Sequence, residues 1–219
     1  TLRVGLIPSE DSRAMLAASD QLLKALEDNL GQKVQGFVAS DYNGVIEAMR
    51  SNHVEVAYLG PFSYVLGTTV APIEAFCTAE TAKSGRTYYH SQIITLKESG
   101  IKTVEDLKGK NFALVDPSST SGHLFPKAGL IKMGIDPDKF FGRVLFTGSH
   151  DANALAVANK RVDAATIADR IYDAAVQKKL IDPEQASADA AKTGEPFAVT
   201  VAEVYGTYQS RLRGANAFD

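Results

Sequence analysis

Short apolar segments alternate with amphipathic ones along this chain, and no other feature constrains the fold as strongly. Residues 2–7 have the composition of a strand, and the next segment carries an apolar stripe at helical spacing from a cap at Ser12 to a glycine stop at Gly31. Strands spaced by helices predict βαβ units on a parallel sheet, with ligand sites at the carboxyl ends of the strands. We therefore expect an α/β fold.

The predicted elements fall into two sets. The first set has strands at 2–7, 34–38, 54–59 and 71–78, with helices after 12, at 41–51 and from 60. The second set has strands at 88–96, 112–115, 143–146 and 162–167, with helices at 103–107, 120–133, 151–159 and 169–179. Two sets predict two lobes, each with a mostly parallel sheet flanked by helices.

Polar stretches suggest where the chain passes between the lobes. Residues 80–86 are polar and predict a crossover, and 196–201 predict a strand that returns to the first lobe. The expected lobes are 1–80 with about 196–219, and about 86–190. The crossovers are then expected near 80–87 and near 192–197.

Composition excludes several classes of partner. The 219-residue chain has a net charge of -3, which argues against nucleic acid and anionic membrane surfaces. No apolar run approaches the roughly 18 residues of a membrane span. The chain opens directly on a strand, so we expect an N-terminus from which an export signal has been removed. A bound anion must then be held by local donors, and we expect no cofactor and no metal.

The most informative stretch is residues 116–123, which we call the hydroxyl loop. It lies between a predicted strand and a predicted helix and contains Ser118, Ser119, Thr120 and Ser121. Hydroxyl groups and free backbone N–H groups at a helix start can bind an anion without lysine. The alternative is ordinary N-capping, which needs only one such residue.

Other polar residues lie at similar junctions. His150 and Asp169 follow two further strands, and Tyr89 opens the second set. Tyr58 and Tyr64 flank a Gly-Pro pair in the first set. Each has a structural alternative: a hydrogen-bonded core histidine, a helix cap, or tyrosines half-buried in strand packing. Their convergence on one crevice makes a joint binding role more attractive than any single residue does.

Several short motifs then occur in a recognisable order. They are Leu59-Gly60-Pro61-Phe62-Ser63-Tyr64, Tyr89-His90-Ser91, Ser99-Gly100-Ile101, Leu107-Lys108-Gly109-Lys110, Asp116-Pro117-Ser118-Ser119-Thr120-Ser121-Gly122-His123, Thr147-Gly148-Ser149-His150-Asp151-Ala152-Asn153 and Val162-Asp163-Ala164-Ala165. From residue 2 to about 181 the chain resembles the phosphate, phosphite and phosphonate family of periplasmic binding proteins of ABC transporters.

The resemblance implies a two-lobed, hinge-bending fold of the type II kind and a periplasmic location. It implies a small oxyanion ligand and an ABC transporter permease as partner. The ligand set that it implies comprises Ser119, Thr120, Ser121, Tyr89, His150, Asp169, Tyr58, Tyr64 and His123. Asp169 would accept a hydrogen bond only from a protonated ligand oxygen and so reject fully ionised competitors.

The single cysteine, Cys77, has two interpretations. One cysteine forms no internal disulfide, and strand alternation puts Cys77 on one face with Ile73 and Ala75, which favours a small core residue. Relatives of the family sense arsenite, which prefers a soft thiolate. The alternative is therefore an arsenite sensor that uses Cys77 and signals to a histidine kinase.

An enzyme is the least favoured class. Ser121, His150 and Asp169 can be drawn as a hydrolytic triad, but the chain has no Gly-x-Ser-x-Gly pattern. Metal-ligating carboxylates do not cluster with the histidines. We therefore expect a protein that binds its ligand without chemistry.

Overall fold

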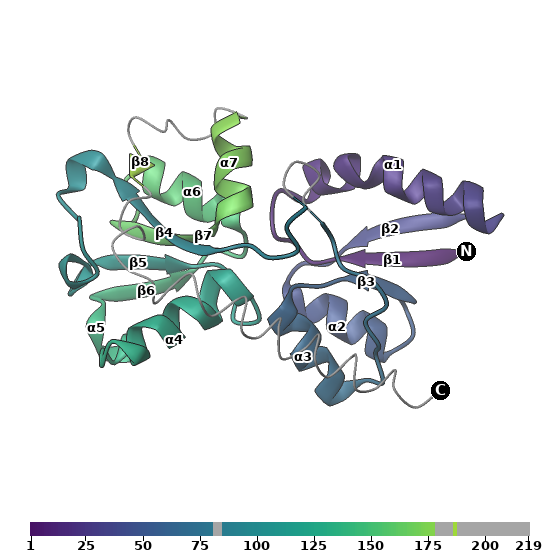
Figure 1. The fold of residues 1–219 in the computed structure, drawn as a ribbon, viewed down its shortest axis with the longest axis horizontal. Helices are drawn as coiled ribbons and strands as arrows, with labels where there is room; N and C mark the ends of the chain where they lie inside the picture. Colours follow the sequence, from purple (N-terminus) through teal and green to yellow (C-terminus); the bar gives the residue numbers. More distant parts are fainter. Residues whose placement is uncertain (81–84, 178–185, 188–219) are drawn as a thin grey trace.

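The computed structural model describes residues 1–80, 85–177 and 186–187. In it two sheets form two α/β lobes that lie side by side, with the N-terminal lobe on the right in Figure 1. Within the described residues, no helix is both long and apolar enough to cross a membrane. The expected α/β class with two lobes is confirmed.

Lobe 1 is built on a parallel three-stranded sheet in the order β2-β1-β3. Its elements are β1 (Leu2–Leu6), α1 (Ser12–Leu30), β2 (Val34–Val38), α2 (Tyr42–Arg50), β3 (Val56–Tyr58) and α3 (Pro61–Val70). The first helix ends at Gly31 in the left-handed conformation, as predicted. Its N-cap is Asp11, which accepts from the Ala14 N–H; the prediction of Ser12 as the cap was wrong by one residue.

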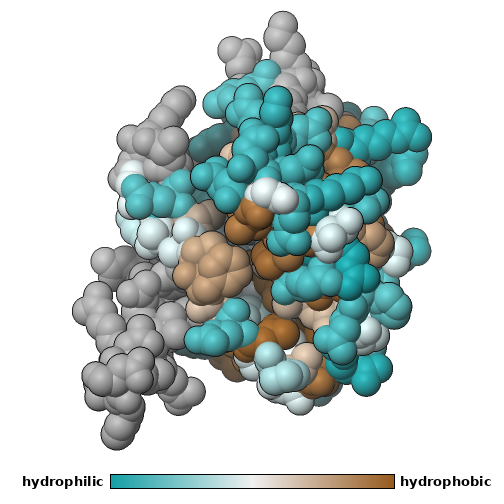
Figure 2. Space-filling model, turned by 90° about the vertical axis from the view of Figure 1, so that its right-hand side faces the viewer, coloured by the Kyte–Doolittle hydropathy of each residue, from teal (hydrophilic) through white to brown (hydrophobic). Residues whose placement is uncertain are grey.

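Lobe 1 has a thin core on the side of its sheet that α1 covers. Val4, Leu6 and Val34 are buried beneath α1, but no residue of α1 itself is buried. Several large apolar side chains of this lobe are exposed, Leu22 and Phe37 among them. Figure 2 shows this end of the molecule, where apolar side chains reach the surface between polar ones.

Lobe 2 is built on a five-stranded sheet in the order β6-β5-β7-β4-β8. Its strands and helices are β4 (Ser91–Leu96), β5 (Asn111–Leu114), α4 (Phe125–Lys132), α5 (Pro137–Phe140), β6 (Arg143–Phe146), α6 (His150–Ala158), β7 (Ala164–Ala168), α7 (Asp169–Gln177) and β8 (Ala186–Ser187). Short helical turns complete it at η1 (Lys97–Ser99), η2 (Glu105–Leu107) and η3 (Thr120–Leu124).

Strand β4 differs from the parallel arrangement of its neighbours. Strand β5 is parallel to both β6 and β7, whereas β4 is antiparallel to β7 and pairs Ser91 with Ala168. The chain enters β4 from lobe 1, so β4 begins at the edge where the other strands end (Figure 1). The carboxyl ends of β5, β6 and β7 therefore face lobe 1.

Residues 71–78 do not form the predicted strand. They make no strand pairing in the described structure, and Cys77 is exposed. The prediction that Cys77 is a core residue was therefore wrong, because an alternating pattern buries one face only where a neighbouring strand and a packed layer exist.

Three smaller differences concern helices and strands. The predicted helix at 120–133 begins with the π-helical turn η3 before α4. The sequence interpretation missed α5, which is capped by Asp136 and starts with Pro137, and it missed the short β8. The predicted strand at 196–201 and the second crossover lie outside the described residues, as does part of the first crossover, 81–84.

Candidate interlobe binding site

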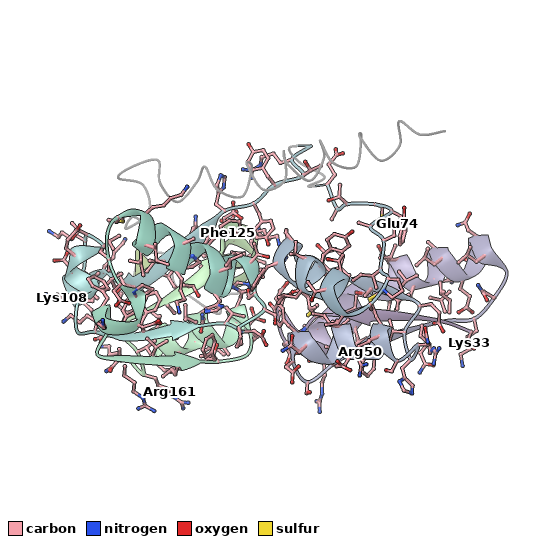
Figure 3. The ribbon with its side chains drawn as sticks, turned by 90° about the horizontal axis from the view of Figure 1, so that it is seen from below. Lys33, Arg50, Glu74, Lys108, Phe125 and Arg161 are labelled. Atoms are coloured by element: carbon pink, nitrogen blue, oxygen red, sulfur yellow. The ribbon has the colours of Figure 1, made fainter. Side chains whose placement is uncertain are left out.

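Helical segments from both lobes begin where the lobes meet. From lobe 1 these are α2 and α3, and from lobe 2 they are η3 with α4, α6 and α7. Figure 3 shows the arrangement: Phe125, at the start of α4, lies at the end of lobe 2 nearest lobe 1, while Lys108 lies at the far end. Helix N-termini carry unpaired N–H groups and a positive partial charge, so this region attracts anions.

The hydroxyl loop is buried at this interface. Ser118, Ser119, Thr120 and Ser121 are only 2–3% exposed. The Ser119 hydroxyl alone acts as the helix cap, because its oxygen accepts from the Gly122 N–H at 3.0 Å. Capping therefore accounts for one of the four hydroxyl residues.

Gly122 allows the loop to pack this tightly. A side-chain carbon added at Gly122 would lie 2.4 Å from the Val115 Cβ and 2.7 Å from the Ser119 hydroxyl oxygen. Both distances are far below normal contact. The glycine is thus required by close packing against the end of β5.

Lobe 1 contacts the hydroxyl loop directly. The Phe62 N–H donates to the Thr120 hydroxyl oxygen at 2.9 Å, and the Ser63 hydroxyl donates to the Ser118 carbonyl at 2.9 Å. The Tyr42 N–H lies 3.4 Å from a carboxylate oxygen of Asp116. The N-termini of α2 and α3 are therefore pointed at the hydroxyl loop.

A second set of contacts joins the lobes through the start of α6. The His150 N–H donates to the Ser9 carbonyl at 2.9 Å, and the Asp11 N–H donates to the Asp151 carboxylate at 3.0 Å. The His150 ring is buried, and its Nδ1 lies 3.3 Å from the Ala168 N–H. Burial, together with the charge of Arg170, lowers the pKa of His150 to about 3. His150 is therefore neutral, and with Nδ1 as an acceptor its Nε2–H is a donor.

Two tyrosine hydroxyls, from the buried Tyr42 and the half-buried Tyr89, complete the polar surface. The Tyr89 hydroxyl forms hydrogen bonds with the side chains of Thr120 and Ser121. The Tyr42 hydroxyl forms one with the side chain of Ser119. Burial raises the pKa of both phenols, so both remain protonated donors. Tyr42 was missed from the sequence, although it follows the predicted strand at 34–38 at the same kind of junction as the other candidates.

Asp169 lies at the edge of this region and is already paired. One of its carboxylate oxygens lies 2.9 Å from His90 Nδ1, and the other accepts the Arg170 N–H at 2.7 Å. His90 was part of a recognised motif but was not assigned a role. The Arg170 guanidinium lies 5.6 Å from the centre of the Tyr89 ring.

The structure brings the remaining candidates together less closely. Tyr58, at the end of β3, is 43% exposed and is close enough to affect Tyr89 electrostatically. Tyr64 is half-buried within α3, past its first turn. His123 instead donates from Nδ1 to the Pro117 carbonyl at 2.7 Å and lines a separate cavity of about 360 Å³ within lobe 2. It is not brought to the interlobe site.

A two-lobed α/β molecule with donors gathered between the lobes has the architecture of a periplasmic binding protein. A family model described as "ABC transporter, phosphonate, periplasmic substrate-binding protein" matches residues 4–211. The chain belongs to this family.

Individual relatives agree with this assignment. The phosphate-import protein PhnD of Mycolicibacterium smegmatis is 36% identical over 192 residues, which cover 83% of this chain and 58% of that protein. The structure is similar to that of a binding-protein component of an ABC phosphonate transporter from Pseudomonas aeruginosa, with a TM-score of 0.78, 34% identity, and coverage of 85% of this chain and 63% of that one.

A second similar structure contains a ligand. It is PhnD1 from Prochlorococcus marinus in complex with methylphosphonate, with a TM-score of 0.76, 20% identity, and coverage of 85% of this chain and 70% of that one. At this identity the likeness bears on the fold alone. The chain spans about three fifths of the length of the first two relatives.

Proposed function

We propose that this chain captures a small phosphorus oxyanion of the phosphonate, phosphite or phosphate kind between its two lobes, for uptake by an ABC transporter. The observation that carries the proposal is the burial of four consecutive hydroxyl residues at the point where helix N-termini from both lobes meet. The proposal includes a periplasmic location and a permease partner, in keeping with the family.

The donor chemistry fits a tetrahedral anion. Hydroxyl groups of the loop and the phenols of Tyr42 and Tyr89 donate short, directed hydrogen bonds to oxyanions. The neutral His150 ring adds an Nε2–H without adding a charge. Hydroxyls, amides and helix dipoles together balance a ligand charge while little of the protein's own charge has to be buried.

Capture is proposed to depend on lobe closure. Each lobe presents part of the donor set, so a ligand forms all of its hydrogen bonds only when the lobes meet. The contacts of Phe62 with Thr120 and of Asp11 with Asp151 then stabilise the closed arrangement around the ligand. Binding shifts the population towards that closed state.

The geometry supports binding without turnover. A hydrolytic triad needs a carboxylate that orients the histidine through its Nδ1–H. Here His150 Nδ1 faces the Ala168 N–H, and the Asp169 carboxylate faces His90. Ser121, His150 and Asp169 are therefore not arranged as a relay.

Calorimetry with methylphosphonate and phosphite tests the proposal. We expect wild-type binding, and we expect Thr120→Ala to weaken it more than tenfold, because the change removes a buried hydroxyl that faces both lobes. Thr68→Ala is the matched control, since Thr68 is an exposed threonine of α3 whose hydroxyl donates to the Val65 carbonyl.

Two results would overturn the proposal. One is the absence of wild-type binding to either anion, and the other is an equal affinity of wild type and Thr120→Ala. Incubation with phosphate esters and acyl esters tests whether the protein is an enzyme. Steady product release that disappears with Thr120→Ala would contradict a pure binding role.

A further inference from the structure

Arg170 carries a positive charge at the edge of the interlobe site, and no role has been given to it. It is the second residue of α7, and its guanidinium lies over the Tyr89 ring. The Tyr89 hydroxyl in turn bonds to Thr120 and Ser121. A single aromatic side chain thus separates this cation from the hydroxyl loop.

The charge of Arg170 reaches several buried groups of the site. Burial raises the pKa of Tyr89 and of Tyr42, and in both cases the Arg170 charge opposes the rise. Burial lowers the pKa of His150, and Arg170 lowers it further. These three groups come from different segments: the stretch before β4, α2 of lobe 1, and α6. Arg170 therefore faces the point where these segments converge.

Nearby carboxylates do not neutralise Arg170. Asp169 is paired with His90, and Asp116 accepts from the Ser118 and Tyr42 backbone N–H groups. Within the part of the chain that the structure describes, no ion pair engages the Arg170 side chain, whose contact is the face of Tyr89. An exposed guanidinium stacked on a ring keeps its charge and its N–H donors available.

We propose that Arg170 makes the interlobe site select doubly charged oxyanions over singly charged ones. The inference rests on the proposed function and names the charge class of its ligand. The Coulomb attraction between a cation and an anion at a fixed distance is proportional to the charge of the anion. A doubly charged ligand is therefore attracted to Arg170 about twice as strongly, in energy, as a singly charged one. The hydroxyl groups of the hydroxyl loop contribute dipoles and no net charge. The expected rejection of fully ionised ligands by Asp169 opposes this selection, but both carboxylate oxygens of Asp169 are engaged, one by His90 Nδ1 and the other by the Arg170 N–H.

Phosphite and hypophosphite provide a direct test. They are similar in size, but phosphite has two ionisable oxygens and hypophosphite has one, so at about pH 8 phosphite is largely doubly charged. Calorimetry at that pH measures both anions on wild type, Arg170→Gln and Arg170→Lys. We expect Arg170→Gln to weaken phosphite about ninefold and hypophosphite about threefold, because a doubled interaction energy squares the ratio of dissociation constants, and Arg170→Lys to retain most of the preference.

The control is Arg161→Gln. Arg161 is exposed in lobe 2 at the opposite end of β7, and in Figure 3 it points away from the lobe interface. Arg161→Gln changes the net charge by the same amount as Arg170→Gln, and we expect it to leave the affinities for phosphite and hypophosphite unchanged.

The outcomes separate the inference from the proposed function. Equal losses for the two anions in Arg170→Gln, or no loss for phosphite, would overturn charge selection by Arg170 while wild-type binding still supports oxyanion capture. If the wild-type protein binds none of the three anions phosphite, hypophosphite and methylphosphonate, the proposed function itself is overturned.

Discussion

The two lobes contribute different kinds of group to the surface between them. Lobe 1 contributes backbone groups to four interlobe hydrogen bonds, namely the N–H groups of Asp11, Tyr42 and Phe62 and the Ser9 carbonyl, and side chains at Ser63 and Asn43 to two others. Lobe 2 contributes side chains to most of these bonds, among them the Thr120 hydroxyl and the carboxylates of Asp116 and Asp151. Lobe 1 therefore depends more on the placement of its helices, and lobe 2 more on the identity of its residues. Substitutions in lobe 2 should consequently have the larger effects.

The largest expected contrast is between two glycines at the interface. Gly122→Ala in lobe 2 forces a methyl group into Val115, so we expect a loss of about 1–3 kcal/mol in unfolding free energy and at least a tenfold loss in oxyanion affinity. Gly60→Ala in lobe 1 places its methyl 3.4 Å from Thr120 Oγ1, close to ordinary contact, and should cost far less. Urea unfolding and calorimetry measure both; equal effects would remove the contrast.

Histidines give the next contrast. His150 has a pKa of about 3 in the folded lobe 2, whereas an unfolded histidine has a pKa of about 6.5. Below about pH 6.5 the unfolded chain binds a proton that the folded chain does not, so stability falls by up to about 1.4 kcal/mol per pH unit until about pH 3. His150→Gln should remove this component of the pH dependence.

His53 in lobe 1 is the control for that experiment, since it is exposed and bonds to the Ser51 hydroxyl. His53→Gln should leave the slope of unfolding free energy against pH as in wild type. A wild-type slope that survives in His150→Gln would show that other groups cause it.

A smaller effect is expected at the start of α6. Asp151→Ala removes the acceptor of the Asp11 N–H, an interlobe hydrogen bond worth about 0.5–1.5 kcal/mol, so ligand affinity should fall about twofold to thirteenfold. Asp163→Ala is the matched control, because the Asp163 carboxylate also accepts a backbone N–H, that of Asn111 at 2.8 Å, but does so within lobe 2. It should lower stability without lowering affinity; a similar loss of affinity in both variants would contradict a closure role for Asp151.

The smallest effect is expected at Cys77. Its side chain is exposed, so Cys77→Ser should change the unfolding free energy by less than about 0.5 kcal/mol and leave phosphite binding unchanged. A thermal-shift panel that includes arsenite checks this. Stabilisation by arsenite that vanishes in Cys77→Ser would favour the sensor alternative over oxyanion uptake.

Local patterns were enough to predict most of the fold. Alternating apolar segments located the described strands of both sheets except β8, and the junctions after them supplied the hydroxyl loop, His150 and Asp169. The pattern failed at 71–78, because alternation alone does not provide a neighbouring strand. It also could not give the direction of β4, which depends on where the chain enters lobe 2.

Pairing between distant residues could not be predicted in the same way. Tyr42 meets Ser119, and His90 meets Asp169, only because lobe 1 and the stretch before β4 fold against lobe 2. Nothing in the local sequence around Arg170 predicts its contact with the Tyr89 ring. His123 lies within the recognised motif, yet the turn of η3 directs it to the cavity behind the loop.

A crystal structure of the chain with methylphosphonate tests the account most directly. The account predicts ligand oxygens about 2.6–3.2 Å from the hydroxyls of Thr120 and Ser121 and from His150 Nε2, with both lobes in contact with the anion. An anion bound elsewhere, such as in the cavity lined by His123, with the hydroxyl loop making the same contacts to lobe 1 and none to the ligand, would contradict it.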